Sequence, residues 1–323
     1  MNGFRGYQLL VAACRLKLPD LVGEGPRSVE ELASATGTHA PSLRRALRGL
    51  VSWGLFSEEA DGRYSATEVS DLFRSDRPGL RNMAVMLSNE GYRVWGELVD
   101  ALQTGQPMFE RLYGMSRWEK MATDPHDAAE FNAAMVETSS RVGREFVEAY
   151  DLGHAHVAVD VAGGNGALLA AVLRAQPSMT GILFDLPAGL AGAAAVMESA
   201  GLSGRVSLVE GSFFESVPAG ADLYLLKSII HDWDDERAVA ILKTCRAAMN
   251  GTARLVLVER VIPEGIPDDD DLGALMSDLH MMVVLGGRER TTAEYSELLA
   301  AAGLRLTRSI PMKSDFHAIE AAL

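Results

Sequence analysis

The fold of this chain is decided by one stretch, Val157-Ala-Val-Asp-Val-Ala-Gly-Gly-Asn-Gly166. A short β-prone run leads into a turn of small residues, and residues 167–175 then predict a helix that ends before Pro177. A strand, a tight turn and a helix in this order form the opening βα unit of a doubly wound sheet, in which ligands bind at the carboxyl ends of the strands. Because the turn lies at the N-terminus of a helix, its backbone N–H groups can meet a polar or anionic ligand.

The spacing of this turn separates it from the dinucleotide fingerprint G-x-G-x-x-G. It reads Asp160-x-Ala162-x-Gly164-x-Gly166, with small residues at every second position after an acidic residue. This pattern resembles the S-adenosylmethionine loop of class I methyltransferases. Taken alone, it also fits a tight βα turn that binds nothing.

Composition narrows the range of partners. The chain has 323 residues and a formal net charge of −14, which argues against nucleic acid or an anionic membrane surface as the main partner. Cys14 and Cys245 are the only cysteines, and no Cys/His cluster accompanies them, so a disulfide scaffold or a structural zinc site is not expected. The N-terminus predicts an amphipathic helix rather than a signal peptide, and no apolar run is long enough to span a bilayer. We therefore expect a soluble cytoplasmic protein.

Residues 1–90 predict a winged helix. Ser28-Val-Glu-Glu31 has the spacing of a capping box, residues 42–51 form an amphipathic helix, and Asp61-Gly62 marks a hairpin turn. Such a domain binds DNA or serves packing and dimerisation. The argument for DNA is a basic group, Arg44, Arg45 and Arg48. The acidic balance of the chain favours packing or dimerisation.

Residues 91–155 predict further helices, with a break at Gly105-Gln-Pro107. Aromatic residues and methionines are concentrated here, and this set fits either a hydrophobic core or a pocket for a flat apolar substrate. Its members are Phe109, Tyr113, Met115, Trp118, Met121, Phe131 and Met135.

From Val157 onward strands and helices alternate, which predicts a parallel sheet with helices on both faces. A late antiparallel pair completes seven strands. The acidic run from Asp268 to Asp271 is interpreted as a solvated loop that leads into a helix N-cap. The expected strands are 157–161, 181–186, 206–210, 223–229, 253–261, 304–311 and 316–321.

Two strand ends carry groups suited to a nucleoside. Asp185 closes the second strand, where its carboxylate can accept hydrogen bonds from both ribose hydroxyls. An NAD enzyme uses the same device, so Asp185 indicates a nucleoside without naming it. After the third strand, Gly211 allows a close backbone approach and Phe213 can cover an adenine face.

The chemistry is indicated by Lys227-Ser-Ile-Ile-His-Asp-Trp-Asp-Asp-Glu236, where a strand ends and a helix begins. Asp232 or Asp234 is expected to cap that helix. His231 then lies at the carboxyl end of a central strand. The ordinary pKa of histidine, about 6.5, suits proton abstraction from a hydroxyl. A carboxylate would fix the tautomer of the ring, and the candidates are Glu259 and Glu289.

With these residues in place, the chain resembles the bacterial small-molecule O-methyltransferases, which are related to the plant caffeic acid type and to enzymes that tailor polyketides and other natural products. The resemblance covers nearly the whole chain. Its most specific motifs are Val159-Asp-Val-Ala-Gly-Gly-Asn-Gly166, Phe184-Asp-Leu-Pro187, His231-Asp-Trp-Asp-Asp-Glu236 and Gly286-Gly-Arg-Glu-Arg-Thr291.

The resemblance implies an α/β architecture in three parts. A winged-helix dimerisation domain, mostly helical, would occupy residues 1–90, and a helical linker and substrate-pocket segment residues 91–155. Residues 156–323 would form a Rossmann-like, seven-stranded methyltransferase domain that binds S-adenosyl-L-methionine. The partners implied are a small aromatic hydroxylated substrate and a second copy of the chain, bound through the N-terminal domain, with no metal, nucleic acid or membrane.

The resemblance also implies roles for individual residues. His231 would be the general base for O-methylation of a hydroxyl, most simply a phenolic one, flanked by Glu259 and Glu289. The substrate pocket would include Trp118, Phe131, Met135 and Met282. The cofactor would be held by Asp160, Gly163, Gly164, Asp185, Leu186, Ser212, Phe213 and Lys227.

Two positions depart from the family pattern. Ala162 stands where a third glycine is common, and Ser212 stands where an aspartate usually meets the adenine amine. Both changes are expected to loosen the cofactor. Three alternatives stay open at this point: a family member that uses S-adenosylmethionine for hydroxylation or rearrangement, a winged-helix regulator with a ligand-sensing domain, and an NAD-dependent oxidoreductase.

Overall fold

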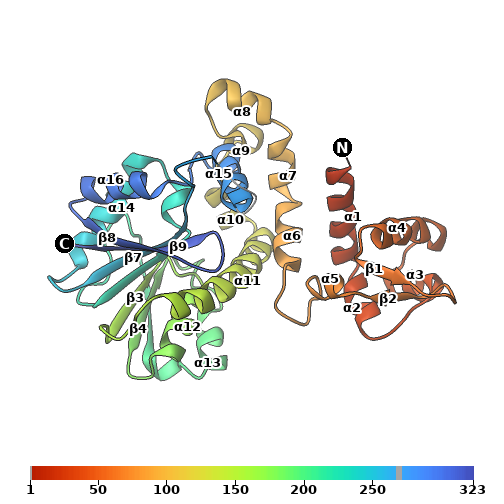
Figure 1. The fold of residues 1–323 in the computed structure, drawn as a ribbon, viewed down its shortest axis with the longest axis horizontal. Coiled ribbons are helices and arrows are strands. Elements are labelled where there is room, and N and C mark those ends of the chain that lie inside the picture. Colours follow the sequence, from red (N-terminus) through yellow and green to blue (C-terminus); the bar gives the residue numbers. More distant parts are fainter. Residues whose placement is uncertain (1, 267–270) are drawn as a thin grey trace. The chain divides into compact units, whose positions relative to one another are not determined.

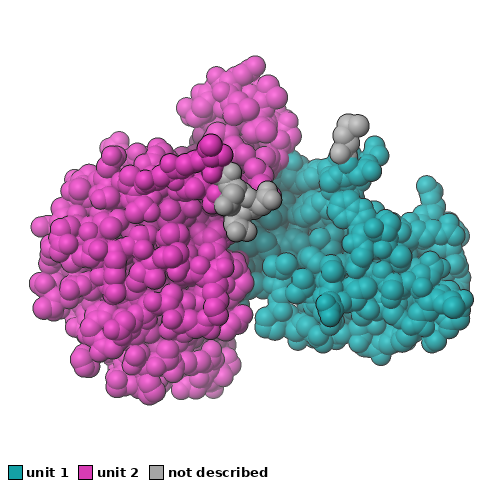
Figure 2. Space-filling view, viewed as in Figure 1, with its two compact units in different colours: residues 1–93, 126–137 teal, residues 94–125, 138–323 magenta. Residues whose placement is uncertain are grey.

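The computed structural model describes residues 2–266 and 271–323. Two compact units are present: one of residues 1–93 and 126–137, the other of residues 94–125 and 138–323 (Figure 1, Figure 2). Residues 91–155, predicted as one helical segment, are thus divided between the two units. The run Asp268–Asp271 falls almost wholly on residues 267–270, outside the described part of the chain.

Residues 29–66 of the first unit have the predicted order of helix, helix and hairpin. The capping box at Ser28 is confirmed, since the Ser28 hydroxyl accepts from the backbone N–H of Glu31 and the Glu31 carboxylate accepts from that of Ser28. The elements of this part are α1 (Gly3–Arg15), α2 (Leu18–Gly23), α3 (Val29–Thr36), α4 (Ala40–Ser52), β1 (Phe56–Glu58), β2 (Tyr64–Ala66), α5 (Glu68–Asp71) and α6 (Arg81–Leu87).

An apolar stripe explains why α4 packs as it does. Leu43, Leu47 and Leu50 recur at helical spacing and are buried in one cluster with Leu32 of α3. The basic side chains lie off this stripe, and the exposed Arg44 forms an ion pair with Glu30 at 3.0 Å. The arginines of α4 therefore cover the outer face of a packed helix.

The middle of the chain is helical, as predicted. Its helices are α7 (Glu90–Trp95), α8 (Leu98–Thr104), α9 (Met108–Tyr113), α10 (Arg117–Thr123) and α11 (Pro125–Ala149). Met108 and Phe109 of α9 are buried in a small cluster with Val283 and Val284. Phe109, a member of the aromatic and methionine set, is therefore part of the core.

The second unit is built on a seven-stranded sheet of order β5-β4-β3-β6-β7-β9-β8, which confirms the predicted strands. Pairings from β5 to β7 are parallel, and β9 is antiparallel to both β7 and β8. The strands are β3 (Val157–Val161), β4 (Thr180–Asp185), β5 (Val206–Glu210), β6 (Leu223–Lys227), β7 (Arg254–Arg260), β8 (Arg305–Pro311) and β9 (Phe316–Ala322).

Helices cover both faces of this sheet, as Figure 1 shows for α12 and α13 on one face and α14 and α16 on the other. The remaining elements are α12 (Ala167–Ala175), α13 (Ala193–Ser199), η1 (Ser203–Arg205), η2 (Ile230–Asp232), α14 (Asp235–Ala248), α15 (Leu272–Val284) and α16 (Thr292–Ala301).

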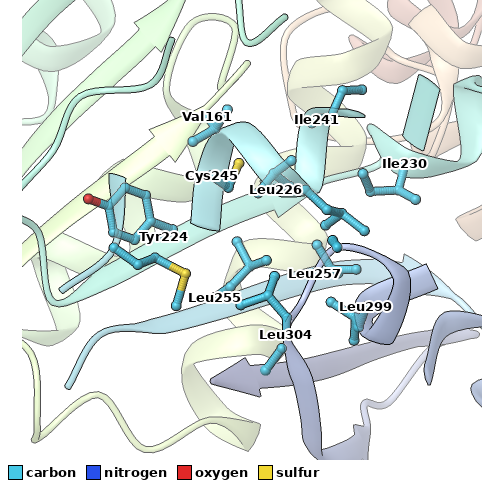
Figure 3. Close-up of a cluster of buried hydrophobic side chains, with 14 of the residues drawn as sticks. Val161, Tyr224, Leu226, Ile230, Ile241, Cys245, Leu255, Leu257, Leu299 and Leu304 are labelled. Atoms are coloured by element: carbon cyan, nitrogen blue, oxygen red, sulfur yellow. The ribbon is translucent and has the colours of Figure 1, made fainter. Parts of the chain in front are cut away.

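Alternate residues of the central strands serve the two faces. Leu226 and Leu257 pack under α14 and α16 (Figure 3), whereas Leu225 and Val256 pack under α11 and α12. All four are fully buried, which is why these strands are apolar without the alternation of a half-exposed sheet.

The strand order determines where in the sheet a ligand site is expected. The chain runs from β3 outward through β4 and β5, then returns to pair β6 with the opposite edge of β3. The carboxyl ends of β3 and β6 therefore lie beside each other at the point where the order reverses, the position at which such sheets bind ligands. Among the described residues, none of the helices is long and apolar enough to cross a membrane.

Candidate active site

The turn after β3 has a left-handed backbone. Ala162 has φ of 55°, and Gly164 and Gly166 have φ of 58° and 84°. The Ala162 N–H donates to the carbonyl of Phe184 at 2.7 Å, so the end of β4 holds this residue in place. Ala162 therefore takes a conformation that costs a non-glycine residue roughly 1–2 kcal/mol.

The glycines of the turn differ in what surrounds them. A Cβ on Gly163 would lie 2.5 Å from the Asp160 carboxyl carbon and 2.5 Å from Leu183. A Cβ on Gly164 would meet nothing within 4 Å. Gly163 thus allows the turn to pack down on the sheet, while Gly164 presents its backbone to open space, as a turn that receives a ligand must.

Asp185 closes β4 beside this turn. Its carboxylate accepts from the N–H of Gly164 at 2.8 Å and from that of Leu186 at 2.6 Å. Burial raises the pKa of Asp185, and these two backbone donors oppose that shift. The carboxylate is thereby held in one orientation, with lone pairs left to accept from hydroxyl groups.

Asp160 lies deeper than Asp185, and the half-buried Lys227 is close enough to affect its pKa. Asp160 is 1% exposed, and its carboxylate accepts from the N–H of Leu169 in the first turn of α12 at 3.3 Å. Burial raises the pKa of Asp160 to about 7 and lowers the pKa of Lys227 to about 8. The Lys227 ammonium donates to the Ser228 hydroxyl at 3.1 Å. Asp160 therefore lies beneath the turn, and the positive charge of Lys227 partly opposes the rise of its pKa.

The loop after β5 carries Ser212 and Phe213. The N–H of Gly211 donates to the Asp185 carbonyl at 3.0 Å, which ties this loop to the end of β4. The Ser212 hydroxyl accepts from the N–H of Phe214 at 3.2 Å. Trp233 stands edge-on to Phe213 and Phe214, with ring centroids 6.1 and 5.0 Å away, and the sequence reasoning gave it no role. The position of Trp233 within the motif His231–Glu236 was the feature that could have indicated a role for it.

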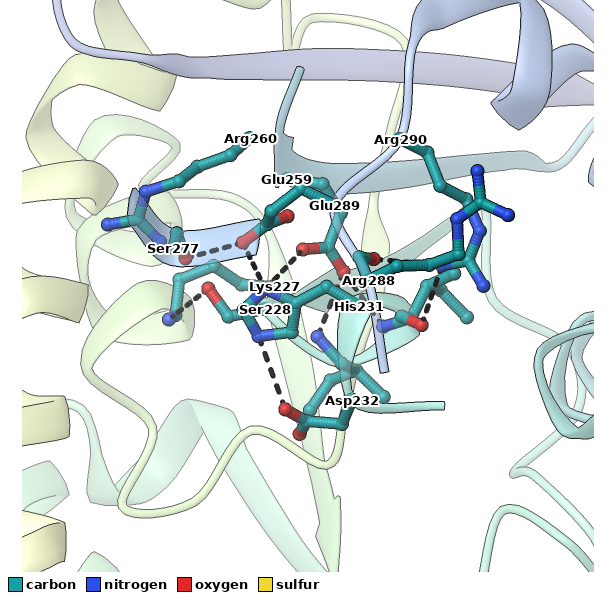
Figure 4. A network of polar contacts seen from close by, with 12 residues as sticks. Lys227, Ser228, His231, Asp232, Glu259, Arg260, Ser277, Arg288, Glu289 and Arg290 are labelled. Atoms are coloured by element: carbon teal, nitrogen blue, oxygen red, sulfur yellow. Dashed lines mark hydrogen bonds and ion pairs between the residues drawn. The ribbon is translucent and has the colours of Figure 1, made fainter. Parts of the chain in front are cut away.

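His231 lies in η2, directly after β6, and is 6% exposed. Its Nδ1 is 2.8 Å from Glu289 Oε1 and 3.8 Å from Glu259 Oε2 (Figure 4). Its Nε2, on the far side of the ring, is 3.4 Å from Asp232 Oδ1. The structure therefore brings together the three residues predicted as catalytic and adds Asp232 to them.

Each carboxylate is held by its own donors. Glu259 Oε1 accepts from the backbone N–H groups of Ile229 and Ile230 at 2.9 and 2.8 Å. Glu289 Oε1 accepts from the Ser277 hydroxyl at 2.6 Å. One Glu thus supports the backbone around His231, and the other is aimed at the ring.

The electrostatics of the cluster are set by burial and by these charges. Burial alone would lower the pKa of His231, but the negative charges of Glu289, Glu259 and Asp232 outweigh it and raise that pKa to about 9. Burial raises the pKa of Glu259 and brings that of Asp232 to about 7. For Glu289 burial acts in the same direction, but the charge and hydrogen bond of His231 prevail and its pKa is lowered.

Arg290 fixes the segment that carries His231. It is fully buried, and its guanidinium donates to the carbonyls of Ile230 and Trp233 at 3.1 and 2.9 Å and to Asp235 at 2.7 Å. Arg290 belongs to the motif Gly286–Thr291 but was given no predicted role. The available signal was its position directly after Glu289, a candidate catalytic carboxylate.

The same three side chains have the types of a metal site. Their ligand atoms lie within 4.8 Å of one another, so His231, Glu259 and Glu289 could hold a cation. The Oε1 atoms of both carboxylates are already engaged by protein donors. That the site works without a metal stays a prediction.

The predicted pocket residues are distributed over both units. Trp118 and Met282 belong to the second unit, and Phe131 and Met135 to the first. Met282 is partly buried against the cluster of Met108 and Val283. Their role toward a substrate stays a prediction. His280, on α15, was given no predicted role, and its Nδ1 accepts a hydrogen bond from Trp95 Nε1 at 3.0 Å.

The sheet order, the nucleoside-type turn and the histidine at the end of β6 together define a class I methyltransferase. The O-methyltransferase domain model matches residues 95–305, and the O-methyltransferase dimerisation domain model matches residues 1–76. The chain belongs to this O-methyltransferase family and is an S-adenosylmethionine-dependent methyltransferase.

Related proteins match this chain over nearly its full length. The chain is 39% identical to the phenazine O-methyltransferase of Lysobacter antibioticus, with 99% of this chain and 94% of the relative covered. It is 35% identical to the 8-amino-8-demethylriboflavin N,N-dimethyltransferase of Streptomyces davaonensis, covering 97% and 90%. A solved O-methyltransferase from neocarzinostatin biosynthesis, in complex with S-adenosylmethionine and 2-hydroxy-5-methyl naphthoic acid, is 36% identical, with a TM-score of 0.82 and coverage of 98% and 96%.

These findings confirm the predicted family, fold, enzyme class and cofactor. The alternatives of an NAD-dependent oxidoreductase and of a ligand-sensing regulator do not agree with them. The relatives include both O- and N-methylating enzymes that act on natural products.

Proposed function

We propose that this enzyme methylates a hydroxyl, most simply a phenolic one, on a small aromatic natural product, with His231 as the general base. The related phenazine and naphthoate enzymes support a flat aromatic substrate. The observation that carries the proposal is the 2.8 Å contact between His231 Nδ1 and Glu289, at the end of the strand next to the nucleoside-type turn.

The residues at the carboxyl ends of β3 and β4 fit S-adenosylmethionine. Gly164 offers backbone over open space, and Asp185 offers an oriented carboxylate for ribose hydroxyls. Ser212 and Phe213 follow the neighbouring strand, where the adenine is expected. When bound, the cofactor supplies a methyl group that its sulfonium has already activated. The protein therefore has to orient the acceptor and remove a proton.

The hydrogen bond to Glu289 decides which nitrogen of His231 takes the proton. With Nδ1–H donating to that carboxylate, Nε2 carries the lone pair and can accept the proton of the substrate hydroxyl. A free phenol has a pKa near 10, and the carboxylates raise the pKa of His231 to about 9, so the transfer is uphill by only about one unit. The ring is then largely protonated at neutral pH, and turnover depends on the small neutral fraction.

The test is a pair of substitutions at His231. His231→Gln and His231→Ala should bind S-adenosylmethionine with wild-type affinity by calorimetry. Methyl transfer to the best phenol of a screen that includes a hydroxyphenazine and a hydroxynaphthoate should drop roughly 10²-fold or more.

The matched control is His317→Gln. His317 lies on β9 and contacts Ser309 at 3.0 Å, and this variant should keep wild-type turnover. Unchanged turnover in both His231 variants would remove the histidine from the mechanism.

N-methylation is the second candidate, because the riboflavin relative acts on an amine. A neutral aromatic amine needs no base before it reacts, so the His231 variants should spare methyl transfer to an amino analogue of the screened phenol. Hydroxylation or rearrangement would give a product whose mass does not correspond to an added methyl group.

The proposal includes a homodimer formed through the N-terminal domain. The dimerisation domain supports it, as do large apolar side chains exposed on that unit, with Phe4 and Trp53 each 55% exposed. Light scattering on the purified protein should give twice the mass of the 34.7 kDa chain. A mass of one chain at micromolar concentration would contradict this part of the proposal.

A further inference from the structure

A histidine outside the catalytic cluster has an unusual partner. Trp95 Nε1, on α7, donates to Nδ1 of His280, on α15, at 3.0 Å. The planes of the two rings are nearly parallel, with centroids 6.4 Å apart and an interplanar angle of 21°. Both residues belong to the second unit, and the mechanism proposed for His231 uses neither.

This contact fixes the tautomer of His280. An indole N–H can only donate, so Nδ1 of His280 must carry a lone pair. The proton of the neutral ring then lies on Nε2. Burial, followed by the positive charges of His231 and Arg117, lowers the pKa of His280 to about 4. At neutral pH the side chain is therefore an uncharged donor with a fixed direction.

The donor lies near the catalytic cluster and is unused within the described chain. Among the described residues, Nε2 of His280 has no hydrogen-bond acceptor, although the side chain is only partly exposed. Ser277, one turn earlier on the same face of α15, donates to Glu289, the partner of His231. One face of α15 thus carries two donors. Ser277 donates to Glu289, and Nε2 of His280 has no acceptor among the described residues.

We propose that His280 selects the substrate by donating its Nε2–H to a neutral acceptor on the aromatic ring system, and that Trp95 is its positioning residue. This inference rests on the proposed function. The acceptor class is a carbonyl oxygen or a ring nitrogen close to the reacting hydroxyl. A carboxylate is disfavoured at this position, because a neutral imidazole offers no countercharge for a buried anion.

The first experiment needs no substrate. Histidine-selective ¹⁵N NMR of the full-length protein reports the tautomer of each ring, and the His280→Gln spectrum assigns the His280 signals among the 7 histidines. The wild type should show His280 neutral from pH 5 to 8 and protonated on Nε2. In Trp95→Phe, which keeps an aromatic ring but lacks the N–H, the fixed tautomer should be lost. A His280 protonated on Nδ1 in the wild type would overturn the inference.

The second experiment compares two probes of one shape, 1-hydroxyphenazine and 1-hydroxyanthracene, which differ by the two ring nitrogens. Binding is measured by calorimetry in the presence of S-adenosylhomocysteine. His280→Leu should weaken binding of the phenazine about 3- to 10-fold and leave the anthracene within about twofold. His280→Gln, which keeps an N–H donor, should recover part of the loss. Trp95→Phe should weaken the phenazine selectively, and His317→Gln should change neither.

The outcomes separate this inference from the proposed function. If phenols are methylated but His280→Leu weakens both probes equally, or the wild type binds neither probe, only the role of His280 fails. If S-adenosylhomocysteine binds and the screen yields no methylated phenol, the proposed function fails and this inference falls with it.

Discussion

Replacing Glu289 by glutamine should move the pH at which the enzyme becomes active. The amide has nearly the shape of the carboxylate and can still accept from His231 Nδ1–H and from Ser277, which lie 2.8 and 2.6 Å away. What it removes is the negative charge that contributes most to raising the pKa of His231. The substitution therefore tests electrostatics with little change in packing.

The magnitude follows from the distance. An opposite charge within hydrogen-bonding distance typically shifts a pKa by roughly 1–3 units. From a starting value of about 9, the pKa of His231 should fall to roughly 6–8 in Glu289→Gln. Only the neutral ring can act as a base. Wild-type activity should therefore rise up to tenfold per pH unit between pH 7 and 9 and then level off, while the variant should level off at lower pH.

The loss in Glu289→Gln should accordingly depend on pH. A weaker base gives a lower plateau, so the deficit should be largest near pH 9.5 and should shrink toward pH 7, where more of the variant is neutral. The assay is kcat/KM for labelled methyl transfer from pH 6 to 10, with a ¹⁵N titration of His231 alongside. Glu297→Gln, on the exposed side of α16, is the matched control and should follow the wild type. A uniform loss at every pH with an unmoved inflection would refute the electrostatic role of Glu289.

Three further predictions concern single side chains. Ala162→Gly should raise the free energy of unfolding by roughly 0.5–1 kcal/mol, measured in urea, because it relieves a φ of 55°; a lower value would show that the turn is not strained. Ser212→Asp should tighten binding of S-adenosylmethionine about 5- to 10-fold by calorimetry, since a carboxylate is the stronger acceptor; equal or weaker binding would mean that this side chain does not face the adenine amine. Arg290→Lys should lower the free energy of unfolding by about 2 kcal/mol, because an ammonium cannot reach Asp235 and the backbone carbonyls together; a change within 0.5 kcal/mol, roughly the range of a surface substitution, would contradict this account.

The sheet could be predicted because its signals are local. An apolar run bounded by small residues identifies each central strand, and β7 was expected at residues 253–261 and observed at Arg254–Arg260. The helix after the His231 segment was predicted with two possible caps. Asp234 is the one used, since it accepts from the N–H of Arg237 at 2.9 Å. The short helices α8 to α10 could not be placed in advance, because helices of this length are stable only through the packing they meet in the folded protein.

Some residues of the candidate site could be predicted from the sequence, and others could not. Asp185 could be found because it ends β4, and His231 because it follows shortly after the end of β6. The end of a strand fixes where the side chains beside it lie. His280 could not be found, because its partner Trp95 is 185 residues away in the sequence and only the fold brings the two rings together. Asp232 was interpreted as a possible cap, and its position beside Nε2 of His231 depends on a 3-10 turn that the sequence does not announce.

Glu259 and Glu289 have different contacts in the structure, although both were predicted as the carboxylate beside His231. Glu259 lies on β7 and uses Oε1 to hold the N–H groups of Ile229 and Ile230, while its Oε2 stays 3.8 Å from the imidazole. Burial raises the pKa of Glu259, whereas the charge and hydrogen bond of His231 lower the pKa of Glu289. A protonated Glu259 would still accept both backbone bonds, and a protonated Glu289 would lose its electrostatic hold on the ring. In the proposed mechanism, Glu289 therefore orients His231 and raises its pKa, and Glu259 positions the segment that carries His231.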